Sequence, residues 1–331
     1  MKHELPIAII LLAIGCMPWL WQHVTPLAAS QSLQNSEDGH VFATEIRDYS
    51  AMQTLPGASA EESRKFLLRV ASSIENGEPS IGNFQIENHL FESQLSGNGK
   101  FWCSGRGRNR SRFELIPNSD DAMITQVCDG RFVYRLIESA ESRTLRFYDL
   151  EKLGSDDFGL QQDPSPVDWI GSNSVTGLLS TLADAFRFEP MKSSADGQQV
   201  ELVGSWDPQL LAKLLINHID HRSILPSPDW SKVPQQIPHG VRLRFTNQQG
   251  DWQPAEFLFF RFDDTQPASQ LTAALTVRFS PLEYQAISDE LFQIDSTGAD
   301  TSEETGAYRR RIEVFTGKRR VADDARLESL K

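Results

Sequence analysis

The clearest pattern in the sequence is a stretch, residues 82–149, in which apolar and polar side chains alternate with a period of two. Such alternation predicts half-buried β-strands, because successive side chains of a strand point to opposite faces of the sheet. We expect strands over 82–95, 99–105, 110–116, 123–128, 131–138 and 143–149, with turns at 96–99, 117–120 and the hairpin dipeptide Asp129-Gly130. Short connections of this kind favour a meander of antiparallel neighbours.

Three other stretches have helical spacing. The first begins at the capping box Ser59–Glu62, carries Phe66, Leu67, Val70 and Ile74 on one face, and stops before Gly77 and Pro79. The second lies near 174–186, and the third starts at the N-cap Asp207 with Pro208 in its first position. Further strands are indicated at 186–190, 198–204, 240–247, 253–262 and 271–280, with one more expected at 308–315.

These elements predict a mainly β (α+β) fold. We expect a curved antiparallel sheet, or half-open β-barrel, of about 10–11 strands with helices in its concavity, because that many strands must curl to hide their edges. The segment 253–262 supports this, since Phe257 and Phe259 point to one face and Leu258, Phe260 and Phe262 to the other. Such a strand is covered on both faces or lines an apolar cavity.

The first thirty residues are typical of a leader. A nearly unbroken apolar stretch, 5–21, follows Lys2 and precedes the small residues Ala28, Ala29 and Ser30, which is the order found in a signal peptide cleaved after Ala29 or Ser30. Two alternatives stay open: an uncleaved membrane anchor at residues 5–21, and a lipoprotein modified at Cys16. We therefore divide the chain into a signal peptide or N-terminal anchor (1–30), a flexible linker (31–56), one domain (57–316) and a charged flexible tail (317–331). The expected location is the periplasm or the outer face of the inner membrane.

Charge and cysteine content narrow the function classes. The net charge of −13 leaves no basic face for a nucleic acid. Outside the leader only Cys103 and Cys128 remain, on the second and fourth strands of the expected meander. Next-but-one strands lie about 9–10 Å apart, beyond the roughly 7 Å limit for the Cα atoms of a disulfide, so we expect two free, partly buried thiols. The sequence indicates no metal site or other cofactor, and it contains none of the catalytic motifs that would indicate an enzyme.

Four short motifs, together with the order of the elements, are shared with a known family. The motifs are Gly99-Lys100-Phe101-Trp102, Arg112-Phe113-Glu114, the hairpin Val127–Tyr134, and Leu291–Ile294 followed by Gly298. They resemble the LolA-type lipoprotein-carrier superfamily, which includes LolB and RseB-like domains, over residues 55–305. The chain departs from the family in lacking proline in 106–110 and in having Ser296-Thr297 at the family's Pro-Pro. Because it has extra residues at 154–172 and 220–240, the chain resembles an enlarged, uncharacterised branch of this superfamily.

The resemblance implies a half-barrel domain that binds an apolar ligand, a lipid acyl chain or a lipoprotein, without catalysis. The candidate cavity residues are Phe84, Ile86, Phe101, Phe113, Phe132, Tyr134, Leu178, Leu182, Leu211, Leu214, Leu215, Phe257 and Phe259. An arginine latches the helical lid in the family, and Arg108 or Arg110 is the candidate here. The alternative is an RseB-like envelope sensor or a structural protein-interaction domain with an envelope protein as partner. In that case the same side chains fill the core themselves.

Overall fold

The computed structural model describes residues 52–55, 57–88, 95–118, 122–154, 174–215, 230, 233, 237–262 and 271–306. The strands of the first half are β1 (Gln53–Thr54), β2 (Ser80–Asn88), β3 (Leu95–Cys103), β4 (Ser111–Pro117), β5 (Met123–Cys128), β6 (Phe132–Glu138) and β7 (Arg143–Asp149). Those of the second half are β8 (Phe186–Phe188), β9 (Lys192–Ser193), β10 (Gln199–Trp206), β11 (Gly240–Gln248), β12 (Asp251–Phe262), β13 (Leu271–Phe279), β14 (Glu283–Tyr284) and β15 (Asp300–Glu303). The helices are α3 (Ala60–Asn76), α4 (Leu150–Gly154), α6 (Val175–Ala185), α7 (Pro208–Leu215) and the 3-10 helix η5 (Asp289–Phe292).

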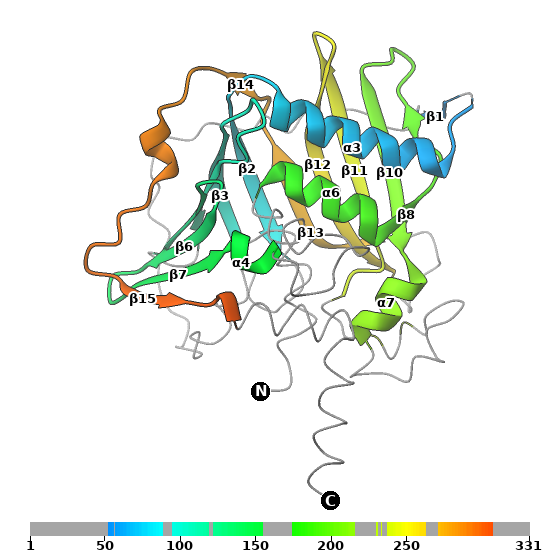
Figure 1. The fold of residues 1–331 in the computed structure, drawn as a ribbon. Coiled ribbons are helices and arrows are strands. Elements are labelled where there is room, and N and C mark those ends of the chain that lie inside the picture. The colour runs from blue at the N-terminus through cyan, green and yellow to red at the C-terminus, as the bar shows by residue number, and fades with distance from the viewer. Residues whose placement is uncertain are drawn as a thin grey trace, which may run out of the picture.

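All fifteen of these strands belong to one curved sheet. Their order is β1-β9-β10-β11-β12-β13-β2-β3-β4-β5-β6-β7-β15, with β14 beside β2 and β8 beside β10. The two end strands, β1 and β15, each have one neighbour in this order, so the sheet does not close on itself. Figure 1 shows helices α3 and α6 lying across one face of the strands, which we call the concave face. The predicted half-open, mainly β architecture is thereby confirmed.

The predicted helices form for the reasons that the sequence gives. Ser59 caps α3 by accepting a hydrogen bond from the Glu62 amide at 3.2 Å, and the face that carries Phe66 and Ile74 is buried. Ser174 caps α6 in the same way, and Asp207 accepts bonds from the first amides of α7. Among the described helices, none has the length and apolar character needed to cross a membrane. The leader, most of the linker and the tail lie outside the described residues.

One predicted turn is wrong. Residues 96–99 lie inside β3 and not between two strands. Gly99 is directly opposite Phe84 in the register, and a Cβ atom on Gly99 would lie 2.1 Å from Cζ of Phe84. Gly82 has the same relation to Phe101, with 2.3 Å to Cζ. These glycines are needed because a phenylalanine ring of the neighbouring strand occupies the space of their side chain.

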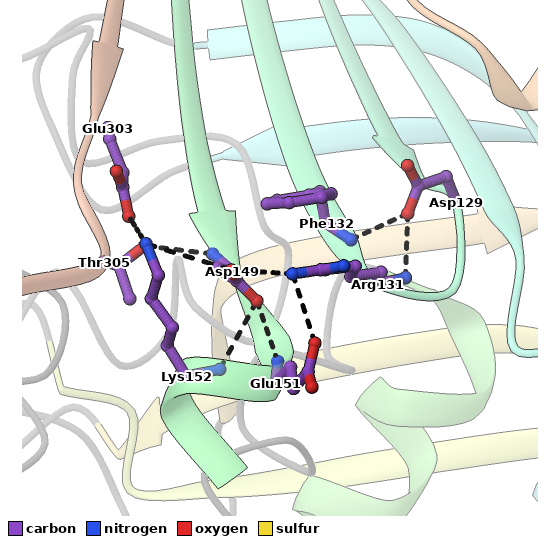
Figure 2. Close-up of polar contacts among 8 residues, drawn as sticks. All are labelled: Asp129, Arg131, Phe132, Asp149, Glu151, Lys152, Glu303 and Thr305. Atoms are coloured by element: carbon purple, nitrogen blue, oxygen red, sulfur yellow. Dashed lines mark hydrogen bonds and ion pairs between the residues drawn. The ribbon is translucent and has the colours of Figure 1, made fainter. Parts of the chain in front are cut away.

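The last strand was not predicted. β15 pairs with β7 in parallel, so the sheet is mixed and not purely antiparallel. Its sequence, Asp-Thr-Ser-Glu, is polar throughout and has no period-two signal. Figure 2 shows how the edge is held: Lys152 forms an ion pair with Glu303 at 2.8 Å, and the Asp149 amide donates to Oγ1 of Thr305 at 3.0 Å. The strand expected at 308–315 lies outside the described residues.

The convex face carries a ladder of alternating charges across five adjacent strands. It runs from Glu201 on β10 through Arg244 on β11, Glu256 on β12 and Arg278 on β13 to Glu87 on β2, with ion-pair distances of 3.0, 3.1, 3.5 and 2.6 Å. The ladder is well shielded at its β10 and β11 end, since the Arg244 and Glu201 side chains are 14% and 11% exposed. Opposite charges directly across neighbouring strands stabilise their pairing, so the ladder fixes the register of this half of the sheet.

The two cysteines are free and buried, as predicted. Cys103 on β3 and Cys128 on β5 are both directly opposite Ser111 of β4, so one full strand separates them. Burial raises the pKa of the Cys103 thiol from 9.0 to about 12, with a smaller contribution from the negative charge of Glu75. Burial likewise raises the pKa of Cys128 from 9.0 to about 11.

These raised pKa values predict alkaline destabilisation. Both thiols are neutral in the folded protein up to a higher pH than in the unfolded chain, so their contribution to stability is complete below pH 9 and is lost above it. Between pH 9 and the folded pKa values, the free energy of unfolding should fall by up to about 1.4 kcal/mol per pH unit for each thiol. Urea unfolding of the wild type and of a Cys103→Ala, Cys128→Ala variant at pH 8 and 10.5 measures this. Equal pH dependence in the two proteins would contradict the assignment, and a Cys103–Cys128 disulfide in non-reduced peptides would contradict the strand order.

Candidate functional site

A continuous row of phenylalanine rings crosses the concave face. From β11 to β4 its members are Phe245, Phe257, Phe279, Phe101, Phe84 and Phe113, and we call this set the aromatic row. Neighbouring ring centroids are 5.9, 4.8, 6.1, 6.5 and 4.6 Å apart in that order, within the range of favourable aromatic contacts. Phe84 and Phe113 are stacked at an interplanar angle of 18°. Six strands, three from each half of the domain, thus build one apolar band.

The glycines opposite this row decide how its rings lie. Phe84 reaches over Gly99 and Phe101 over Gly82, because neither glycine has a side chain to hold the ring away from the sheet. The Phe84 and Phe101 rings therefore lie low over the neighbouring strand. An apolar floor of this kind suits either a helix packed upon it or an extended apolar chain.

Helices α3 and α6 cover the β8 to β12 side of this floor. Phe66 of α3 contacts Phe245 and Trp252 with ring centroids 5.3 and 5.4 Å apart. Arg64 fastens α6 to α3, donating to the Ala183 carbonyl at 3.2 Å and pairing with Asp184 at 2.6 Å. At the other end of the row, Phe113 is only partly buried. The row is therefore shielded at one end and reaches solvent at the other.

The structure brings most of the predicted cavity residues together. Phe84, Ile86, Phe101, Leu178, Leu182, Leu211, Phe257 and Phe259 belong to one apolar cluster, with Phe113 packed against it. Within this cluster Phe257 and Phe259 are 0% and 2% exposed. Leu214 and Leu215 belong to α7, but their side chains lie outside what the structure describes.

Phe132 and Tyr134 do not share the face of the other candidates. Phe113 is opposite Gln126, and Gln126 is opposite Arg135, so these three side chains lie on the concave face. Because side chains alternate along β6, Phe132 and Tyr134 lie on the convex face. There they contact Phe147, with centroids 6.1 and 6.0 Å away, while Arg131 lies over the Phe132 ring at 5.0 Å. Sequence alternation alone could not relate the faces of β4 and β6, because that relation depends on the register.

The two candidate latch arginines do not contact the helices of the concave face. Arg108 and Arg110 both approach Oδ1 of Asp289 at 3.3 Å, so they fasten η5 and not a helix of the concave face. Near them a hollow of about 300 Å³ is lined by Arg106, Arg108, Tyr284 and Asp289, among others. Its lining mixes these groups with apolar side chains, among them Pro79, Ile287 and Phe292, and it includes no member of the aromatic row.

Two polar residues that the sequence did not single out continue the aromatic row. Gln126 and Arg135 follow Phe113 on the next two strands and are 2% and 8% exposed. Nε of Arg135 donates to Oε1 of Gln126 at 3.0 Å, while Nε2 of Gln126 has no hydrogen-bond partner among the residues that the structure describes. In the sequence both residues stand at polar positions of alternating strands, so only the register shows that they point inward.

Comparison with known proteins gives remote structural likenesses. No protein-family model matches the chain, and no curated protein matches its sequence. Similar solved structures include an uncharacterised conserved protein from Thermus thermophilus, with 10% identity and a TM-score of 0.39 over 73% of this chain and 99% of that one. A chain of the MucA/MucB complex from Pseudomonas aeruginosa has 15% identity and a TM-score of 0.33 over 71% and 62%. A LolA superfamily protein from Nitrosomonas europaea has 11% identity and a TM-score of 0.28 over 71% and 98%. The proposals below are based on this chain's own residues.

Proposed function

We propose that this chain is an exported, non-catalytic binding protein of the cell envelope, and that it holds an extended apolar chain, such as a lipid acyl chain, on the aromatic row. The observation that carries the proposal is the continuity of the row across six strands, with one end reaching solvent at Phe113. Apolar surface of this kind binds by removal from water, at about 25 cal/mol per Å². The Phe84 and Phe101 rings lie over Gly99 and Gly82 and are 2% exposed, so a chain that binds on them displaces the side chains that shield them.

The proposal divides the predicted cavity residues into two groups. Phe84, Phe101 and Phe113 form the binding floor near the solvent-reaching end. Phe257 and Phe259, shielded beneath α3 and α6, belong to the permanent core. Binding then requires a shift of part of the cover, and Arg64 is the polar contact that a shift of α6 would break.

The variant Phe113→Glu tests this function. It places a charge on the floor where the side chain is already partly exposed, so the fold should be retained. Displacement of a fluorescent fatty acid should show affinity reduced about tenfold to a hundredfold, the equivalent of losing one buried Phe contact. Ile116→Glu is the matched control, because Ile116 lies on the same strand, faces the other side and is 59% exposed. Circular dichroism checks folding, and equal affinity of the two variants would contradict the proposed floor.

A second function is favoured by the burial of the same residues. Most of the apolar side chains that the structure describes on the concave face are buried, and α3 and α6 shield those on the β8 to β12 side, with Leu179 and Phe257 at 0% exposure. A domain whose core is filled in this way fits a protein-interaction or sensor role in the envelope. Native mass spectrometry of protein purified from its source separates the two functions. Co-purified lipid supports the binding protein, and bare protein that also fails to bind a fluorescent fatty acid supports the interaction domain.

A further inference from the structure

The polar end of the aromatic row carries a charge that the described residues do not balance. Arg135 is 8% exposed and lies on the concave face, and no carboxylate of the described residues forms an ion pair with it. Its cross-strand neighbour on β7 is a second arginine, Arg146. Like charges directly opposite each other destabilise strand pairing. Arg146 is paired with Glu304 at 3.3 Å and donates to Oγ of Ser302, so its charge is balanced while that of Arg135 is not matched by a described carboxylate.

Burial makes this arrangement costly for the protein alone. A shielded cation without a counter-charge loses its hydration without compensation. The orphan Nε2 of Gln126 adds an unsatisfied donor, 2% exposed, at the same place. A guanidinium and an amide N–H₂ supply donors only, so the chemistry that satisfies them together is an anionic oxygen.

We propose that Arg135 and Gln126 form a headgroup subsite for the carboxylate or phosphate of an anionic amphiphile whose apolar chain lies on the aromatic row. This inference rests on the proposed function and names the ligand class. From β13, which carries Phe279, to β6, which carries Arg135, there are five strand spacings of about 4.8 Å, or about 24 Å along the sheet. That length suits a single long acyl chain with its charged end at β5 and β6.

The subsite has the features that fix the orientation of a ligand. Its donors lie on two adjacent strands of a sheet, where the register holds their backbones in place. The hydrogen bond from Nε of Arg135 to Gln126 orients the guanidinium, and its terminal N–H groups stay available. An apolar band ending in a few convergent polar groups is the usual form of a small-molecule site.

The test compares three probes of equal chain length, namely dodecanoate, dodecyl phosphate and dodecanol, by displacement of a neutral fluorescent probe. The wild type should bind at least one anionic probe about tenfold to a hundredfold more tightly than dodecanol, as expected for hydrogen bonds to a charged group. Whichever of dodecanoate and dodecyl phosphate binds more tightly identifies the headgroup. Arg135→Met should remove this preference and leave dodecanol binding unchanged. It should also fold normally, since it removes an uncompensated charge while keeping the volume of the side chain.

Arg131→Met is the matched control, because Arg131 precedes β6, is 59% exposed and approaches Asp149 and Glu151 instead. It should keep the wild-type preference for anions. Failure of all three probes would overturn the proposed function and this inference with it. Equal binding of the three probes, or an Arg135→Met variant that keeps the preference, would overturn the headgroup subsite and leave the apolar floor standing.

Discussion

Phe259→Glu should unfold the domain. The Phe259 ring is 2% exposed on the concave face and is part of the apolar cluster that α3 and α6 cover. Removing a buried phenylalanine costs about 3–5 kcal/mol through lost burial and the cavity left behind. A carboxylate at the same place adds the penalty of a buried, unpaired charge, which is several kcal/mol more. The sum approaches the whole stability of a typical domain, about 5–15 kcal/mol.

The control for this result is Phe113→Glu, which places the same charge on the same face of the sheet at a partly exposed position. Far-ultraviolet circular dichroism and urea unfolding should show an unfolded or severely destabilised Phe259→Glu and a folded Phe113→Glu. Ile116→Glu, on the exposed face, should change the free energy of unfolding by less than about 0.5 kcal/mol. If Phe259→Glu instead stays folded and loses fatty-acid binding, the ligand floor extends beneath α6 and the division between core and floor is wrong.

Most of the fold could be predicted from interactions between residues that are close in sequence. The capping box at Ser59, the Pro208 start of α7 and the Asp129-Gly130 hairpin depend on neighbours in sequence, and each is found as predicted. Figure 2 shows the Asp129 carboxylate accepting from the Arg131 and Phe132 amides, as this turn requires. Period-two alternation also located the long strands to within a few residues, because one face of each is buried.

The wrong turn at 96–99 and the unpredicted strand β15 have the same physical cause. Gly97 and Gly99 signal a turn in isolation, but Phe84 and Leu115 of neighbouring strands take the space that their side chains would fill. β15 has no apolar face and depends on the ion pair of its own Glu303 with Lys152 and on that of the adjacent Glu304 with Arg146. In each case the deciding interaction is between residues far apart in sequence. A single sequence does not contain the register that brings them together.

The same limit applies to the candidate site. Phenylalanines at alternating positions indicated an apolar face, and most of them do share one. The assignment of Phe132 and Tyr134 to that face failed because the inward positions of β6 are Val133, Arg135 and Ile137. For the same reason the inward-pointing Arg135 was not among the predicted site residues. A buried cation of this kind is visible only when the strand register is known.

Arg244→Leu should cost about 3 kcal/mol of stability, as expected when one partner of a shielded ion pair is removed. Arg244 lies between Glu201 and Glu256, at 3.0 and 3.1 Å, and is 14% exposed. Without it, two half-buried carboxylates on β10 and β12 lose their shared counter-charge and repel each other across β11. Leucine keeps apolar contact with the neighbouring strands, so the loss measured by urea unfolding reports on charge more than on volume.

Three comparisons make this last prediction specific to the charge ladder. Arg278→Leu, at 38% exposure, should cost no more than about 1 kcal/mol, because an exposed pair is largely screened by water. Adding Glu256→Gln to Arg244→Leu should recover part of the loss, since it removes one of the two facing charges. Raising the salt concentration should narrow the gap between Arg244→Leu and the wild type, because salt screens the remaining repulsion. Equal losses for Arg244→Leu and Arg278→Leu, unchanged by salt and by Glu256→Gln, would show that packing and not charge holds these strands in register.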